Sequence, residues 1–363
     1  MSLDSKKGLF LLGIIAGLAA MVLAIWGNPK NMAMCIACFI RDTAGSFKLH
    51  QAEVVQYFRP EIVGIVLGAF LISLFTKEYR STGGSAPAIR FLLGAIMVIC
   101  ALVFLGCPLR MVLRMSSGDI SGYVGLVGFA LGVGTGAFFL KKGFSLGRSY
   151  TIKKESGYVL PLLITVAFLV SLFAPSLFAF SEKGPGSVHA AIGLSLGAGI
   201  IFGVIAQRSR MCFAGSIRDI ILLKDFKLIS VIGGVFVVML VYNIASGNFQ
   251  IAAYGPIAHA QTLWNVLSMY AVGLCAVLLG GCPLRQLILA GSGSSDAIVT
   301  VVGMFVGAAL AHNFSLAGAP ASAATAEKAA SAGGPGINGQ IFVIASIVIL
   351  FIIAFIGIKK KEQ

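Results

Sequence analysis

The chain has 363 residues, of which 58% are hydrophobic and only 11% are charged. This composition leaves too little polar surface to cover a water-soluble globule of that size, so we expect the chain in a lipid bilayer. The formal net charge of +14 does not indicate a nucleic-acid partner, because the basic residues gather in short loops beside apolar segments.

Ten apolar segments follow one another, each long enough or nearly long enough to cross the roughly 30 Å hydrocarbon core. They are residues 8–26, 60–76, 90–105, 122–140, 158–180, 188–206, 228–245, 263–279, 297–311 and 339–358. The first is interpreted as a retained helix, because no small-residue cleavage site follows it. The predicted fold class is all-α: a polytopic membrane protein of about ten spans with re-entrant or broken half-helices.

The basic residues predict the orientation of these spans. If the N-terminus is cytoplasmic, more than two thirds of the 27 Lys and Arg residues lie on the cytoplasmic side, as short cytoplasmic loops require. The tail Lys359-Lys360-Lys361 then lies on that side too. We therefore predict that both termini are cytoplasmic.

Two motifs occur twice. The segment MCIACFIRD, which begins at Met34, returns as MCFAGSIRD at Met211, and GCPLR returns in full at Gly281 after its first copy at Gly106. The separations are 177 and 175 residues. The two copies of each motif follow helices predicted to run in opposite directions, so the halves are predicted to be inverted repeats. Such repeats with interrupted hydrophobic segments are typical of transporters.

The repeat predicts five parts. They are a first repeat (1–157), a linking transmembrane helix (158–187), a second, inverted repeat (188–315), a flexible outer loop (316–338) and a C-terminal transmembrane helix with a basic tail (339–363). Glycines four residues apart predict close helix contacts within the bundle. Examples are Gly64 with Gly68, Gly128 with Gly132 and Gly136, and Gly193 with Gly197.

The repeated GCPLR motif has the features of a helix start. Glycine permits a sharp break, and proline at the first helical position loses no hydrogen bond. The thiol is then expected at the helix N-cap, near free amides and the positive end of the helix dipole, which favours an anion. The residues concerned are Gly106, Cys107 and Pro108 in the first copy and Gly281, Cys282 and Pro283 in the second.

Four arginines belong to the same motifs. Arg110 and Arg285 lie one helical turn after their cysteines, where each can hold an anion or cap a neighbouring carbonyl. The alternatives are a buried salt bridge and a side chain that snorkels to the membrane interface. Arg41 and Arg218 each precede an aspartate, and for them mutual neutralisation of the neighbouring charges is the stronger interpretation.

The Cys35-x-x-Cys38 spacing alone suits a redox pair or half of a metal site. A zinc site needs further converging ligands, and His50, His189, His259 and His312 show no ligand spacing, so we predict no metal and no cofactor. No nucleotide-binding glycine loop is present, which argues against direct use of ATP. Asp42, Asp119, Asp219 and Asp296 are candidate proton sites, although a structural role is the stronger expectation for each.

With these motifs the chain resembles the YeeE/YedE family of membrane proteins over nearly its full length. The doubled GCPLR, the stretch RSRMCFAG at 208–215 and the IRD endings carry the resemblance. It implies import of sulfur species, thiosulfate in particular, into bacterial cells. Segments 144–150 and 181–186 look more like a branch of the family assigned to selenium.

The resemblance also implies a pathway across the inner membrane in which thiols contact the passing anion in sequence. Carried over by position, its cysteines are Cys35, Cys107, Cys212 and Cys282, whereas Cys38 departs from the pattern because Gly215 takes its place in the second half. The expected partners are a small sulfur or selenium anion, membrane lipid and a small cytoplasmic sulfur-carrier protein. Two other functions stay open: a membrane thiol-redox enzyme, and a pore or accessory subunit for another small solute.

Overall fold

The computed structural model describes residues 5–322, 324 and 329–358. These residues are mostly helical, which confirms the all-α prediction. The helices are α1 (Lys6–Ile25), α2 (Ile36–Ser46), α3 (Pro60–Phe75), α4 (Pro87–Val103), α5 (Pro108–Ser116), α6 (Ile120–Lys141), α7 (Lys154–Phe173), α8 (Ile192–Arg208), α9 (Phe213–Leu223), α10 (Lys227–Ala245), α11 (Thr262–Leu279), α12 (Pro283–Gly291), α13 (Ser295–Asn313) and α14 (Ile337–Ile356), with the short 3-10 turns η1 (Lys30–Met32) and η2 (Pro175–Leu177).

Four strands of two residues form two small antiparallel pairs. Strand β1 (Thr82–Gly83) pairs with β2 (Tyr150–Thr151), and β3 (Gly318–Ala319) pairs with β4 (Gly334–Pro335). The second pair lies in the segment expected as a flexible loop, of which residues 323 and 325–328 lie outside the described part. The basic tail 359–361 also lies outside it.

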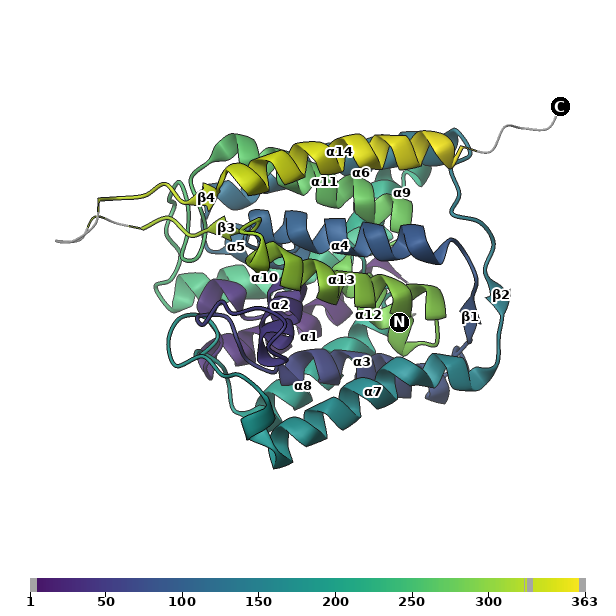
Figure 1. Ribbon diagram of the computed structural model, residues 1–363, viewed down its shortest axis with the longest axis horizontal. Coiled ribbons are helices and arrows are strands. Elements are labelled where there is room, and N and C mark those ends of the chain that lie inside the picture. Colours follow the sequence, from purple (N-terminus) through teal and green to yellow (C-terminus); the bar gives the residue numbers. More distant parts are fainter. Residues whose placement is uncertain (1–4, 323, 325–328, 359–363) are drawn as a thin grey trace.

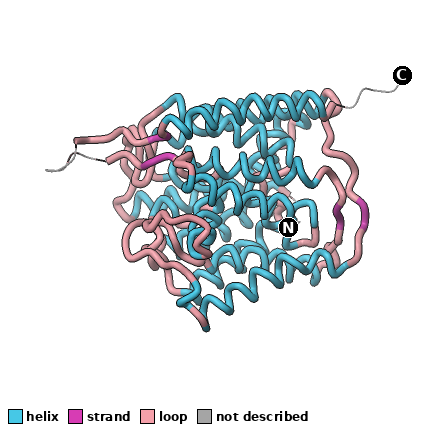
Figure 2. Tube along the Cα trace, viewed as in Figure 1, coloured by secondary structure: helices cyan, strands magenta, loops and turns pink. Residues whose placement is uncertain are grey.

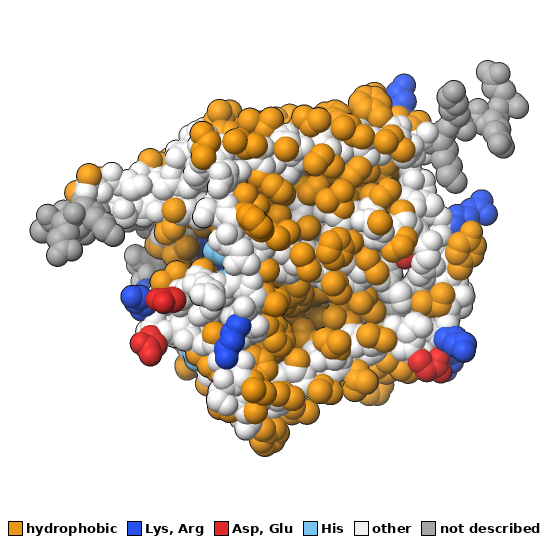
Figure 3. Space-filling model, in the orientation of Figure 1, with side chains coloured by type: hydrophobic (Ala, Val, Ile, Leu, Met, Phe, Trp, Pro, Cys, Tyr) orange, Lys and Arg blue, Asp and Glu red, His pale blue; other side chains and the backbone are white. Residues whose placement is uncertain are grey.

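The long helices identify a multi-pass membrane protein. Over the described residues, nine helical segments are long and apolar enough to cross a membrane, and the 16-residue α3 is a shorter apolar helix. Nine of the ten predicted segments coincide with one of these helices to within four residues at each end. The predicted end of segment 158–180 is wrong, because α7 stops at Phe173, just before Pro175, which has no amide hydrogen to continue the helix. Figure 3 shows hydrophobic side chains over the middle of the molecule, with Lys, Arg, Asp and Glu toward its two ends.

The loops gather at two opposite ends of the helices (Figures 1 and 2). We call the end with the loops 26–35, 47–59 and 246–261 the pocket face, and the end with β1, β2 and the turns 209–212 and 292–294 the hairpin face. Helix α4 begins on the hairpin face, whereas α11, its counterpart in the repeat, begins on the pocket face (Figure 1). These two helices therefore run in opposite directions.

The helix contacts also come in matched pairs. Helix α1 packs on α10 and α3 on α8; α4 packs on α13 and α6 on α11. In the repeat, α1 corresponds to α8, α3 to α10, α4 to α11 and α6 to α13. The contact of α1 with α10 therefore corresponds to that of α8 with α3, and the contact of α4 with α13 corresponds to that of α11 with α6. Helices α7 and α14 have no counterpart and pack at the periphery, α7 against α3 and α14 against α11.

Small residues make these contacts close. A Cβ added to Gly64 or Gly68 would collide with the backbone of α8, and one added to Gly128 or Gly132 would collide with the backbone of α11. Gly136 meets the side chain of Val277 on the same helix. The glycine prediction is thus confirmed in α3 and α6.

The prediction is wrong for Gly193 and Gly197. A Cβ at either position would meet nothing within 4 Å, because both glycines line a shallow apolar groove beside α1. The spacing of small residues shows that a helix can be approached closely on that side, but it does not show that another helix is there.

Candidate functional site

The four short helices α2, α5, α9 and α12 each begin at a buried cysteine. They have only 9 or 11 residues, about 14–17 Å of helix, and so cannot cross the hydrocarbon core. Their N-cap residues are Cys35, Cys107, Cys212 and Cys282, all with extended backbone. The predicted N-cap positions of Cys107 and Cys282 are confirmed.

The thiols use these positions in two ways. Cys35 Sγ accepts the amide of Cys38 at 3.4 Å, and Cys212 Sγ accepts the amide of Gly215 at 3.2 Å, so each caps its own helix. Cys107 and Cys282 form no such cap. Cys107 Sγ instead accepts the amide of Ile36, the first residue of α2, at 3.3 Å. The thiol of Cys107 thus meets a free amide, as expected at an N-cap, but the amide belongs to the neighbouring half-helix.

The glycine of GCPLR also has a different role from the expected one. The residue with left-handed backbone is the one before it, Leu105 in the first copy and Gly280 in the second. A Cβ on Gly106 would press on the side chain of Arg110, and one on Gly281 on that of Arg285. The glycine therefore leaves room for the arginine of its own motif to fold back over the chain break.

A first thiol cluster consists of Cys35, Cys38 and Cys107. Cys35 and Cys38 have Sγ atoms 2.6 Å apart, and all three residues are at most 1% exposed. Arg110 adjoins the cluster, with Nη1 3.7 Å from Cys38 Sγ. Helices α2 and α5 thus bring together two motifs that lie about 70 residues apart in the chain.

A second thiol cluster, Cys212 with Cys282, lies in the other half. The two Sγ atoms are 4.0 Å apart, and both residues are buried. Gly215 stands where Cys38 stands in the first cluster, so this cluster has two thiols instead of three. Arg285 holds the position equivalent to Arg110.

Arg110 is fully buried and contacts no carboxylate. Its guanidinium donates to the backbone oxygens of Asn31 (3.2 Å), Ile257 (3.0 Å) and Leu105, and to Asn31 Oδ1 (3.4 Å). No ion pair involves Arg110 within the described residues. The charge is therefore held by neutral acceptors, and the salt bridge considered as an alternative is not present.

Arg285 also contacts no described carboxylate, but it connects to the hairpin face through a chain of polar groups. Its Nη1 donates to Gln207 Oε1 at 3.3 Å, and Gln207 Nε2 lies 3.5 Å from Glu78 Oε2. Glu78 also pairs with Arg208 at 3.3 Å and with the more exposed Arg210 at 3.4 Å. This series of polar contacts leads from the second thiol cluster to the surface.

The remaining arginines of the motifs are neutralised. Arg41 pairs with Asp42 at 2.7 Å, and Arg218 pairs with Asp219 at 2.8 Å, as the stronger interpretation predicted. Asp42 also holds Arg59 at 2.7 Å. The structure gives Asp119 and Asp296 similar roles: the first pairs with Arg114, and the second accepts hydrogen bonds from serines of neighbouring loops.

Cys100 and Cys275 lie outside both clusters. Both are fully buried, and Cys275 Sγ lies 3.0 Å from the backbone oxygen of Leu93, within the contact between α4 and α11. They serve as the matched controls for the clustered thiols.

Two histidines of the pocket-face loops have a lowered pKa. Burial lowers the pKa of His50, and burial with the nearby Arg114 charge lowers the pKa of His259 to about 4. His259 Nε2 lies 3.0 Å from the backbone oxygen of Val103, while its buried Nδ1 has no partner. Both rings are therefore neutral at pH 7.

The sequence analysis missed three residues. Asn31 accepts a hydrogen bond from Arg110. Glu78 pairs with Arg208 and Arg210 and accepts from Gln207, the partner of Arg285. Glu61 is a fully buried carboxylate that accepts hydrogen bonds from Asn28 at 2.8 Å and from Ser195 at 3.2 Å. None belongs to a repeated motif. An acidic residue inside an apolar segment was a usable signal for Glu61; Asn31 and Glu78 carry no such signal.

Comparison with known proteins finds a family match in the C-terminal part of the chain. Residues 208–363 match the model of a family described as sulphur transport, the YeeE/YedE family. The matched part contains Cys212, Cys282 and Arg285, and it confirms the resemblance drawn from the motifs. A search of curated proteins finds no match.

Proposed function

From the sulphur-transport family match of residues 208–363, we propose that this chain is an inner-membrane transporter that imports a small soft anion containing sulfur or selenium, such as thiosulfate. The anion passes along a path lined by the two thiol clusters and the N-termini of the half-helices. The opposite directions of α4 and α11 support an inverted repeat, the arrangement in which such paths form between two halves.

The observation that carries the proposal is the pair of arginines without carboxylates. Arg110 and Arg285 each lie three residues after an N-cap thiol, and neither pairs with a described acid, whereas Arg41, Arg59 and Arg114 all do. Arg110 is fully buried and Arg285 is half-buried, and a charge held there only by neutral groups is costly in a membrane. An anion that passes both thiol clusters supplies the missing charge.

Thiols suit a soft anion better than a hard one. The sulfur of cysteine is polarizable and its S–H is a weak donor, so it favours terminal sulfur or selenium over carboxylate or phosphate. Weak contacts also allow release, which transport requires. No covalent turnover is needed for this passage, and the proposal assigns no cofactor.

We place the hairpin face in the cytoplasm. Arg80 contacts the turn 292–294, Arg208 and Arg210 pair with Glu78, and Arg148 lies just before β2, so these basic residues gather on the hairpin face, as the rule for short cytoplasmic loops expects. Import then proceeds from the first cluster to the second and leaves along the chain from Arg285 to Glu78. A small cytoplasmic sulfur-carrier protein is the partner we expect to receive the anion on this face.

The decisive experiment is uptake of radiolabelled thiosulfate, and separately of labelled selenite, into proteoliposomes. We expect saturable uptake that falls at least about tenfold in Cys107→Ser and Cys282→Ser, because each loses a polarizable contact in a narrow path. Cys100→Ser and Cys275→Ser are the controls and should retain it. If neither label enters above empty liposomes, the proposed substrate class is wrong.

One observation favours the thiol-redox alternative: the 2.6 Å separation of Cys35 and Cys38. A redox enzyme that cycles this pair through a disulfide loses its activity in Cys38→Ser. A transporter retains uptake in that variant, because the second cluster operates with Gly215 at the equivalent place. Full uptake in Cys38→Ser therefore supports transport, and its complete loss supports the redox reading.

A further inference from the structure

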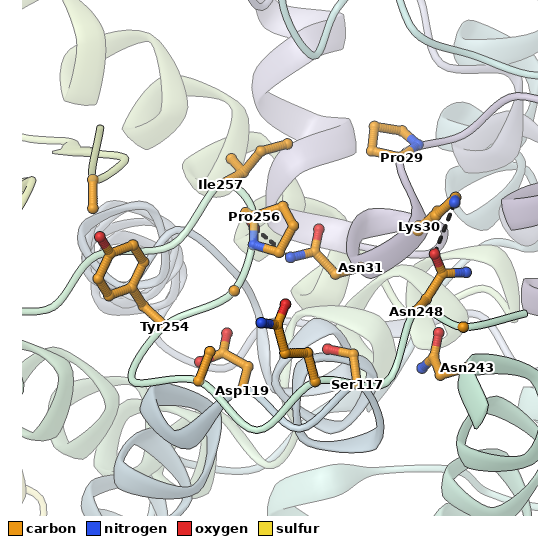
Figure 4. Close-up of a pocket in the computed structure, with 15 residues that line it drawn as sticks. Pro29, Lys30, Asn31, Ser117, Asp119, Asn243, Asn248, Tyr254, Pro256 and Ile257 are labelled. Carbon is orange, nitrogen blue, oxygen red and sulfur yellow. Dashed lines mark hydrogen bonds between the residues drawn. The ribbon is translucent and has the colours of Figure 1, made fainter. Parts of the chain in front are cut away.

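A cavity of about 600 Å³ opens on the pocket face beside the first thiol cluster. Its walls come from three segments that are distant in sequence: the chain around η1, the turn between α5 and α6, and the loop 246–257 (Figure 4). Side-chain amides and a lysine dominate the polar part of the lining, with Lys30, Asn31, Asn243, Asn248 and Gln250 among them. These groups supply hydrogen-bond donors suited to an anion.

The charge of the lining is positive. Asp119 is the one acid among the lining residues, and it is neutralised by Arg114 at 2.7 Å. Lys30 Nζ donates to Asn248 Oδ1 at 2.8 Å, across the mouth of the cavity (Figure 4), and pairs with no described carboxylate. A small anion in this cavity therefore meets one free positive charge and no free negative one.

The inner wall of the cavity is held by Arg110. Asn31 and Ile257 both line the cavity, and both are acceptors for this guanidinium, Asn31 Oδ1 at 3.4 Å and Ile257 O at 3.0 Å from Nη2. The same guanidinium lies 3.7 Å from Cys38 Sγ through Nη1. One side chain thus connects the cavity wall to the first thiol cluster.

The loop that forms this wall is strained. Ile257 has φ +52°, a left-handed conformation that β-branched residues rarely adopt. Its contacts with Arg110, and the hydrogen bond from Asn31 Nδ2 to the neighbouring Pro256 O, hold it there. Loss of these contacts lets the turn relax, so the wall is poised to move.

We propose that this cavity is a loading site for a small anion, and that the contacts of Arg110 with Asn31 and Ile257 form a latch between the cavity and the first thiol cluster. An anion that enters past Lys30 competes with these two neutral acceptors for Nη2 of Arg110. A charged acceptor binds a guanidinium more strongly than an amide or backbone oxygen does. The competition frees Ile257, and the turn moves away from the thiols.

This inference rests on the proposed transport function for its direction but has its own tests. The first measures how fast a membrane-impermeant maleimide modifies Cys38 in the purified full-length protein, with the modified peptide identified by mass spectrometry. Asn31→Ala removes latch contacts and should raise the rate about tenfold or more. Asn31→Asp loses the hydrogen bond to Pro256 O but turns the contact with Arg110 into an ion pair, and because the charge-assisted contact is the stronger of the two, the rate should fall.

Two further variants complete this test. Ile257→Asn keeps the backbone acceptor but tolerates left-handed backbone, so the closed latch is less strained and modification of Cys38 should slow. Asn248 lines the same cavity without touching Arg110, so Asn248→Ala should leave the rate of Cys38 modification unchanged. Equal rates in Asn31→Ala, Asn31→Asp and the unmodified protein would overturn the latch.

The second test uses sulfate as an unreactive dianion. Sodium sulfate should raise the unfolding temperature more than sodium chloride at equal ionic strength, with a saturable dependence. Lys30→Met should weaken this apparent affinity severalfold, and Asn31→Ala should tighten it because a competitor of the anion is removed. No difference between sulfate and chloride overturns the loading site. Neither the modification of Cys38 nor the unfolding temperature depends on uptake. A failure of the transport proposal is therefore seen in the proteoliposome experiment alone.

Discussion

At the scale of the residue, two arginines on one short helix have different partners. Arg110 and Arg114 are both fully buried on α5, one turn apart. Arg114 pairs with Asp119 at 2.7 Å and donates to Phe104 O at 2.9 Å, so its charge is neutralised within the fold. Arg110 has only neutral acceptors. Arg110 lies one helical turn after Cys107 and Arg114 lies two turns after it, so both follow the thiol on the same short helix and they differ in their partners.

We expect Arg114→Met to lower the free energy of unfolding by about 3–5 kcal/mol, because Asp119 is left as an uncompensated buried charge. Adding Asp119→Asn should recover part of that loss. The exposed Arg148→Met is the control, with an expected change within about 0.5 kcal/mol. Unfolding in detergent, followed by circular dichroism, measures all three; a double variant no more stable than Arg114→Met would contradict this account.

His259 predicts a pH dependence of stability. Its pKa in the folded protein is about 4, below the value near 6.5 of an unfolded chain, because of burial and of Arg114, which outweigh the opposing charge of Asp119. The neutral form of His259 is the one that the folded protein favours. Its contribution to the free energy of unfolding is therefore complete above pH 6.5 and is lost as the pH falls toward 4. At pH 5 the loss is about 2 kcal/mol.

The measurement is the unfolding temperature of the protein in detergent between pH 7.5 and 5. His259→Gln keeps a donor for the backbone oxygen of Val103 but does not titrate, so it should flatten part of the pH profile. His50 also has a lowered pKa and accounts for a remaining slope of the same sign. An identical profile in His259→Gln would exclude His259 as a cause.

At the scale of the element, the long helices pack in pairs whose backbones touch at glycines. Gly128 and Gly132 bring α6 onto α11, and their counterparts Gly303 and Gly307 bring α13 onto α4. Because the backbones touch at these positions, the long helices are fixed relative to one another. The half-helices that carry the thiols are thereby held between fixed supports.

We expect Gly132→Ala to lower the free energy of unfolding by about 1–3 kcal/mol, since the new methyl group meets the backbone of Tyr270 and overpacks the contact. The control is Gly197→Ala on α8, where a Cβ meets nothing within 4 Å. There we expect a gain of about 0.5–1 kcal/mol from helix propensity. Similar effects of the two substitutions would show that backbone contact is not the cause.

At the scale of the whole molecule, the two thiol clusters belong to opposite halves, one associated with the pocket face and one with the hairpin face. The first adjoins the cavity through Arg110, and the second reaches the surface through Gln207 and Glu78. In the proposed path, this separation gives an anion two binding positions between the two sides of the membrane.

The proposed orientation has a direct test. All seven native cysteines are buried, so an exposed cysteine introduced on either face is the main target of a membrane-impermeant maleimide. Lys30→Cys should react in intact spheroplasts, because the proposed orientation puts the pocket face outside. Arg148→Cys should react only after permeabilisation. The reverse pattern would invert the orientation and turn import into export.

Much of the molecule was predictable because membrane physics acts locally. A helix in lipid must satisfy its own backbone hydrogen bonds, so apolar length alone marks α1 or α14. The repeated motifs likewise predicted the N-cap positions of Cys107 and Cys282, because proline fixes the first helical residue. The charge pairs Arg41–Asp42 and Arg218–Asp219 are sequence neighbours and need no fold to meet.

The sequence by itself thus determined where the apolar helices lie and that thiols stand at the helix starts, since each depends on contacts within a few residues or on the lipid. Only the tertiary structure decided which groups meet across the chain. It set Cys107 against the amide of Ile36, left Arg110 without a carboxylate and placed Ile257 over it. It also left Gly193 without a neighbour. These outcomes depend on how helices far apart in sequence pack, which no local pattern records.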